Sequence, residues 1–197
     1  TMNVCAAKED IRKFSVEMLK DDLQRMEYVP GNYYNFHPGA HVQQGADVAI
    51  PLIAEALNEA LFENCRTIVL LETMAGKGTE VGRSFEELQQ IIERVKYPEK
   101  VGVCFDTCHV WDAGYDVVED IDGVLATFDR IIGLDKLKAV HLNDSKNAKG
   151  SHKDRYEKIG EGFLGEDGIK RVVTHPLLQG KPFILETPNE DEGYAKE

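Results

Sequence analysis

Apolar runs rich in β-branched and aromatic residues recur along the chain, and stretches with helical periodicity separate them. The apolar runs predict strands at residues 32–37, 67–73, 101–106, 137–142 and 182–187. The periodic stretches predict helices at residues 8–27, 46–63, 84–95, 119–133 and 166–174. Almost continuously apolar strands that alternate with helices are typical of a parallel sheet covered by helices.

Local signals refine these boundaries. Ser84 is followed three residues later by Glu87, which predicts a capping box at the start of the helix at 84–95. A short additional strand is considered at Met2–Cys5. A loop is expected around Trp111, a long polar loop at 143–162 and a frayed tail at 189–197.

Each expected strand ends near a side chain that can bind a metal ion. These side chains are His37, Glu72, Asp106, His109, His141 and Glu186. The strand ends follow one another at intervals of roughly 35 to 45 residues, which is typical of a barrel of strand–helix units whose strand ends meet at one mouth. Imidazole and carboxylate together suit zinc, manganese or iron, so we expect a metal site there.

A closed (β/α)8 TIM barrel usually needs about 250 residues, whereas this chain has 197. We therefore expect an α/β fold in which residues 1–197 form a single, incomplete TIM-barrel domain without the first two strands and the last helix. Such a sheet would have open strand edges on both sides.

The composition is that of a soluble globular protein, with 42% apolar and 29% charged residues. No apolar run approaches the roughly 20 residues that span a bilayer, and no signal segment opens the sequence, so we expect no membrane partner and a cytoplasmic location. The 4 cysteines show no disulfide framework. Cys104 and Cys108 flank Asp106, and we expect them to be small buried side chains rather than thiolate ligands.

The net charge of −12, taken alone, argues against a nucleic-acid partner, which usually requires a basic patch. Two or three divalent cations would offset about four to six of these charges at the mouth of the barrel. Positive residues also gather in one loop beside the expected site, namely Lys146, Lys149, Lys153 and Arg155. This clustering indicates that the loop positions a phosphate.

A glycine-rich segment, AGKGTEVG, follows closely after Glu72 and has glycines at positions 76, 78 and 82. It lacks the spacing of a P-loop and of a dinucleotide-binding fingerprint. Its glycines would let backbone amides approach a phosphate, but a flexible turn explains them equally well. Asp154 likewise is either a metal ligand in the long loop or a solvated charge.

Six segments follow one another along the chain, namely NFHPGAH (35–41), LLETMAGKGTEVG (70–82), VGVCFDTCHVWDAGYD (101–116), HLNDSK (141–146), KDRYEKIGEG (153–162) and ILETPN (184–189). In this order they resemble the endonuclease IV family of zinc-dependent apurinic/apyrimidinic endonucleases. The resemblance implies a (β/α)8 barrel that holds up to three zinc ions. It assigns His37 and Glu72 to the first metal, Glu72, Asp106, His141 and Glu186 to the second, and His109 and Asp154 to the third. It also implies that Glu72 and Glu186 are catalytic.

Two features depart from the family pattern. The family takes a further histidine ligand of the first metal, and a tyrosine that inserts into DNA, from the sequence before the point at which this chain begins. The family motif Asp-Arg-His reads Asp154-Arg155-Tyr156 here. A phenol with an ordinary pKa of about 10 is a poor zinc ligand, so we expect the third metal to be weakly held, absent or bound by a phenolate. His152 could replace the missing imidazole, whereas His41 is expected to orient a ligand and His175 to be structural.

The resemblance implies zinc-dependent hydrolysis of the phosphodiester 5′ to an abasic site in duplex DNA, which leaves a 3′-hydroxyl and belongs to base excision repair. We expect a monomer whose Gly76, Lys77, Gly78, Lys146 and Arg155 contact the DNA. One alternative is a metal-dependent sugar isomerase or epimerase on a similar barrel, against which the Asp154 loop and HLNDSK argue. Another is an inactive fragment of the family that binds DNA or zinc without cutting.

Overall fold

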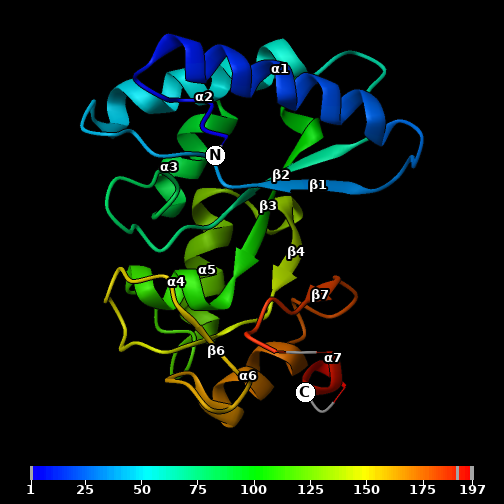
Figure 1. Cartoon of the computed structure of the whole chain (residues 1–197). Helices are drawn as coiled ribbons and strands as arrows, with labels where there is room; N and C mark the ends of the chain where they lie inside the picture. Colours follow the sequence, from blue (N-terminus) through cyan, green and yellow to red (C-terminus); the bar gives the residue numbers. More distant parts are fainter. Residues whose placement is uncertain (1, 190, 196–197) are drawn as a thin grey trace.

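A five-stranded sheet forms the centre of the computed structural model, which describes residues 2–189 and 191–195. Its strands lie in the order β1 (Tyr33–Phe36), β2 (Ile68–Glu72), β3 (Val101–Asp106), β4 (Leu137–His141) and β7 (Phe183–Ile184). Each neighbouring pair is parallel. Figure 1 shows the sheet running through the molecule from β1 beside α1 to β7 near the C-terminal end.

The longer helices pack against one face of this sheet. In chain order the helices are α1 (Glu9–Met26), α2 (Ala46–Ala60), α3 (Phe85–Ile92), α4 (Thr107–Ala113), α5 (Ile121–Ile131), α6 (Gly165–Thr174) and α7 (Asp191–Tyr194), with 3-10 turns η1 (Pro98–Lys100) and η2 (Leu134–Lys136). Helix α1 packs on α2, α2 on α3 and α3 on α5 (Figure 1). Among the described residues, no helix has the length and apolar character needed to cross a membrane.

Side-chain alternation along the strands separates two faces of the sheet. One set of strand residues shares the main core with the helices and includes Val69, Leu71, Val103 and Phe105. The other set forms a small separate cluster of Leu70, Cys104 and Ala139. Because successive side chains point to opposite faces, Glu72, Asp106 and His141, two positions further on, lie on the same face as this small cluster. The strand register also places Asp106 opposite His141.

The structure corrects several local expectations. A helix, α4, stands where a loop was expected around Trp111, because Asp106 caps its start and Gly114, with φ 110°, ends it. No strand forms at Met2–Cys5, whose Val4 and Cys5 are instead buried in the core. Strand β7 is two residues long, shorter than the expected 182–187.

Two segments that were expected to be irregular contain regular structure. The polar loop at 143–162 includes an antiparallel ribbon of β5 (Asp144–Ser145) and β6 (Tyr156–Glu157). The tail contains the short helix α7, while residues 190, 196 and 197 lie outside the described residues. The ribbon depends on contacts across the loop, which local sequence patterns do not encode.

The predicted start of α3 is confirmed, with one difference. Ser84 Oγ accepts a hydrogen bond from the backbone N–H of Glu87 at 3.3 Å, as a capping residue does. The Glu87 side chain accepts from the backbone N–H groups of Gly82 and Arg83, at 2.7 and 3.2 Å. The start of the helix therefore also fixes the glycine-rich segment that precedes it.

The buried carboxylate of Asp144 ties the ribbon to the start of α6. Its Oδ2 accepts from the backbone N–H groups of Gly160, Gly162 and Gly165 at 3.1 to 3.2 Å. Its Oδ1 accepts from those of Ser145 and Leu164 at 2.8 Å. An anionic group with five amide donors fixes the course of this segment more tightly than a neutral acceptor would.

We expect Asp144→Asn to lower the free energy of unfolding by about 3 kcal/mol, because the amide NH₂ group would face backbone N–H donors and leave some of them unsatisfied. Thermal or urea unfolding of the purified variant measures this change. Asp167→Asn, which removes the same charge from an exposed position in the first turn of α6, should change the stability by well under about 1 kcal/mol. Equal effects of the two substitutions would contradict the structural role of Asp144.

Candidate metal centre

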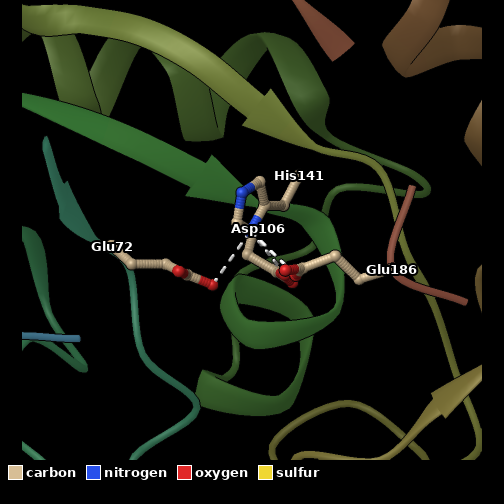
Figure 2. A group of neighbouring side chains, drawn as sticks. All are labelled: Glu72, Asp106, His141 and Glu186. Carbon is tan, nitrogen blue, oxygen red and sulfur yellow. Dashed lines mark hydrogen bonds and ion pairs between the residues drawn. The ribbon is translucent and has the colours of Figure 1, made fainter. Parts of the chain in front are cut away.

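Four of the predicted ligands converge beyond the carboxyl ends of strands β2, β3, β4 and β7 (Figure 2). They are Glu72, Asp106, His141 and Glu186, here named the quartet, and each offers a ligand atom within 4.8 Å of the others. His141 Nδ1 lies 3.2 Å from Glu72 Oε1 and 2.9 Å from Glu186 Oε2. It also lies 3.9 Å from Asp106 Oδ2, so the imidazole faces all three carboxylates.

The quartet combines strong burial with one opening to solvent. Glu72 and Asp106 are 1% and 0% exposed, and His141 is 7% exposed. The side chain of Glu186 is 42% exposed and is the accessible member. The three carboxylates repel one another, and the burial of Glu72 and Asp106 costs free energy unless positive charge lies close by.

Two asparagines that the sequence analysis did not select hold the carboxylates in place. Asn35 Nδ2 donates to Glu72 Oε2 at 2.6 Å. Asn143 Nδ2 donates to Asp106 Oδ2 at 2.7 Å, and its Oδ1 accepts from the backbone N–H of Glu186 at 2.9 Å. Their positions carry a signal: Asn35 precedes His37 by two, and Asn143 follows His141 by two, so strand alternation places each on the side of the ligand.

The other three predicted ligands surround the quartet without joining it. His37, largely exposed, has its Nε2 3.5 Å from Glu72 Oε2. His109 is buried, and its Nδ1 donates to the carbonyl oxygen of Thr73 at 2.8 Å, which leaves Nε2 facing Asp154 Oδ1 at 3.1 Å. The two histidine rings lie 6.0 Å apart, on either side of Glu72.

Charge and burial shift the pKa values of these groups in opposite directions. Burial would raise the pKa of Glu72, but hydrogen bonds from His109 and His141 lower it below its usual range. Burial raises the pKa of Asp106 despite the charge of His109. Burial opposes protonation of His109 and His141, yet the surrounding carboxylates and the hydrogen bonds at each ring raise both pKa values well above the usual range. The site thus attracts positive charge, whether as protons or as metal cations.

A buried carboxylate on α4 holds the loop that carries Asp154. Asp112 Oδ2 accepts from the backbone N–H of Asp154 at 2.8 Å, and its Oδ1 accepts from Ser145 Oγ at 2.7 Å. The carbonyl oxygens of Trp111 and Asp112 accept from the backbone N–H groups of Gly150 and His152. These bonds fix a loop in which Asp154 takes a left-handed φ of 52°, and they aim its carboxylate at His109.

The remaining histidines contact the backbone. His152 Nδ1 donates to the carbonyl oxygen of Ala75 at 2.7 Å, so its ring faces the glycine-rich segment rather than the quartet. His41 Nδ1 accepts from the N–H of Gly45, and His175 Nδ1 accepts from that of Leu177. The expected structural role of His175 is consistent with this contact.

The residues predicted to contact DNA lie on two neighbouring loops beside the centre. Lys77 Nζ lies 3.5 Å from Asp154 Oδ2 and so joins the two loops, while Arg155 donates to the carbonyl oxygen of Asp154 within its own loop. Lys146 and Arg155 are exposed. Gly78 is exposed with φ 62°, whereas Gly76 is buried, and a Cβ there would lie 3.1 Å from Arg83 and His152. Close packing therefore explains Gly76, and only Gly78 stands open to a ligand.

The donor set of the quartet fits a divalent transition metal. One imidazole nitrogen and three carboxylate oxygens suit zinc, manganese or iron. Donor atoms within 4.8 Å of one another can reach a common ion at about 2.0–2.2 Å after small side-chain rotations. The third metal implied by the resemblance fits less well, because Tyr156 stands beside His109 and Asp154 where an imidazole was expected.

The fold and the sequence both match known proteins. A sequence model of the xylose isomerase-like TIM barrel family matches residues 1–197. A protein of Alkaliphilus oremlandii named probable endonuclease 4 is 61% identical over 197 residues, which are 100% of this chain and 70% of that protein. The expected TIM-barrel fold is thus confirmed, with five parallel strands in the described residues.

Solved structures agree with this relationship. Endonuclease IV from Thermus thermophilus superposes with a TM-score of 0.85 at 37% identity, over 99% of this chain and 69% of that one. A D-tagatose 3-epimerase-like protein gives a TM-score of 0.70 at 19% identity, over 98% of this chain and 70% of that one, which shows a common fold alone. The chain therefore belongs to the endonuclease IV family of the xylose isomerase-like TIM barrels.

Proposed function

We propose that this protein is a zinc-dependent endonuclease that hydrolyses the phosphodiester 5′ to abasic sites in duplex DNA. The observation that carries the proposal is the convergence of three carboxylates and an imidazole at the strand ends. Membership of the endonuclease IV family supports a nuclease rather than a sugar-converting enzyme. The four cysteines are free, buried thiols, which fits the proposed cytoplasmic location.

The proposed zinc ligands divide into groups. The quartet would hold one ion, and His37 would share Glu72 with a neighbouring ion, since His37 Nε2 lies 3.5 Å from Glu72 Oε2. When bound, such ions make a nucleophile from water near neutral pH and stabilise the attacking and leaving oxygens. Glu72 and Glu186 would be catalytic as well as ligating.

The chain's own residues would orient the reaction. Hydrogen bonding to His141 lowers the pKa of Glu186, so the carboxylate is ionised, and its exposure lets it accept a proton from the attacking water. The bond that breaks joins phosphorus to the 3′ oxygen of the preceding nucleotide. The products are then a 3′-hydroxyl and a 5′-phosphate on the abasic residue.

Positively charged side chains near the centre would bind the DNA backbone. Lys77, Lys146 and Arg155 would bind backbone phosphates, and Gly78 would let its loop approach them closely. These contacts need no base readout, because an abasic site is distinguished by what is missing and by how easily the duplex deforms. The net charge of −12 would be offset locally by bound cations.

Removal of the metal with EDTA should abolish nicking of a duplex that contains one abasic analogue. The metal-free protein should also melt about 5–10 °C lower, because the buried carboxylates lose their compensating charge. Elemental analysis measures the metal content, differential scanning calorimetry the melting temperature and a gel-based assay the nicking activity. Added zinc should restore the activity. Full nicking by metal-free protein would refute the proposal, and turnover of a keto sugar without nicking would favour the epimerase alternative.

Glu186→Gln should lower the nicking rate about 10²- to 10⁴-fold, because the amide can neither accept the proton nor ligate as an anion. Single-turnover kinetics at saturating DNA separate this effect from binding. Glu161→Gln removes the same charge from an exposed loop position and should retain the wild-type rate. A Glu186→Gln variant with a wild-type rate would exclude Glu186 from the reaction.

Lys146→Ala and Arg155→Ala should weaken binding to all duplexes alike. Each lost phosphate contact should reduce the slope of log K against log salt concentration by about 0.9. Fluorescence anisotropy at several salt concentrations measures this slope. Lys170→Ala, at an exposed position on α6, is the matched control, and a slope unchanged in the first two variants would remove these residues from the DNA contact.

A further inference from the structure

The hydroxyl of Tyr156 lies among the proposed metal ligands rather than outside them. Its oxygen lies 3.1 Å from Asp106 Oδ2 and 3.4 Å from Glu186 Oε2, so both carboxylates are acceptors within reach of its single O–H. It also lies 3.2 Å from His109 Nε2, and the two rings are 5.6 Å apart. One phenol thus links two carboxylates of the quartet to the neighbouring imidazole and fills the space between them.

The family resemblance assigns a third metal to the same imidazole, through His109 and Asp154. These two residues offer one nitrogen and one oxygen, 3.1 Å apart. Zinc in proteins usually takes at least three protein ligands. Among the described residues, the quartet is the group of His, Cys, Asp or Glu side chains that could hold one ion, and neither His109 nor Asp154 belongs to it.

Neighbouring protein groups compensate the negative charge of Asp154 without a metal. Lys77 Nζ lies 3.5 Å from Asp154 Oδ2, while His109 Nε2 faces Asp154 Oδ1. The bond from its backbone N–H to Asp112 fixes the carboxylate in this position. His109 and Asp154 are therefore both engaged with protein groups, and Tyr156 supplies a hydrogen-bond donor where the family motif has an imidazole.

We propose that Tyr156 takes the place of the third cation, so that this chain has no third zinc site, and that its hydroxyl is a positioning group for Asp106 and Glu186. The inference rests on the metal-binding part of the proposed function and not on nuclease activity. It distinguishes this protein from the three-metal arrangement that its family resemblance implies.

Two substitutions at this position should change different properties, one the zinc affinity and the other the zinc stoichiometry. Tyr156→Phe keeps the ring but removes the donor, so zinc stoichiometry should stay at the wild-type value while zinc affinity falls about 10- to 100-fold. Tyr156→His supplies an imidazole beside His109 and Asp154, so it should bind one zinc per chain more than wild type. Elemental analysis after dialysis measures stoichiometry, and competition with a chelating dye measures affinity.

The control variants are made at Tyr28, which is 89% exposed. Tyr28→Phe and Tyr28→His repeat the same chemical changes away from the centre and should alter neither quantity. Circular dichroism and thermal unfolding of each variant establish that the fold is retained. An ultraviolet difference spectrum of the wild-type protein on zinc addition needs no variant, and it should show no tyrosinate absorption.

Four results would overturn the inference. Loss of one zinc in Tyr156→Phe, or a tyrosinate signal on zinc binding, would make the phenolate a ligand. An unchanged zinc number in Tyr156→His would show that residue 156 does not decide the site. A wild-type chain that binds no zinc would overturn the proposed metal centre as well, whereas zinc binding without nicking would overturn only the proposed nuclease function.

Discussion

The burial of two carboxylates, Glu72 and Asp106, beside imidazole rings at one edge of the sheet is the constraint on which the rest of the structure depends. Glu72 and Asp106 are almost completely enclosed, and their mutual repulsion requires nearby positive charge and hydrogen-bond donors. The donors come from separate parts of the chain, namely Asn35, Asn143, His109, His141 and Tyr156. Each donor also restricts the position of a carboxylate, so the same interactions that make burial tolerable shape the proposed metal centre.

Helix α4 connects this centre to the long polar loop at 143–162, which hydrogen bonds hold in place. Asp106 Oδ1 caps the helix while Oδ2 faces the quartet, so one side chain ends a strand, begins a helix and joins the ligand set. At the other end, carbonyl oxygens of α4 accept amides of the loop, and Asp112 holds Asp154. Because α4 is only 7 residues long, these two ends are separated by about two turns.

The barrel itself does not specify the chemistry, because a related fold occurs in a D-tagatose 3-epimerase-like protein. The chemistry proposed for this chain depends on the set of side chains at the strand ends and on the two loops beside them. Lys77 reaches Asp154 across those loops, and Tyr156 reaches Asp106 from the ribbon. The loops therefore complete a centre that the strands begin.

The sequence by itself determined the five strands, most of the helices and six side chains near the strand ends that are of metal-ligating type, because apolar runs and helix periodicity are local properties of the chain. It also selected Asp154 through the family motif. The family resemblance assigned Glu72, Asp106, His141 and Glu186 to one metal, and the tertiary structure brings these four side chains together. Only the tertiary structure decided that Asn35 and Asn143 hold them and that α4 replaces a loop. Those outcomes depend on register between strands far apart in sequence and on hydrogen bonds across loops. The position of the Tyr156 hydroxyl among the carboxylates has the same origin, since the ribbon that carries it is fixed by Asp144 and its distant amides.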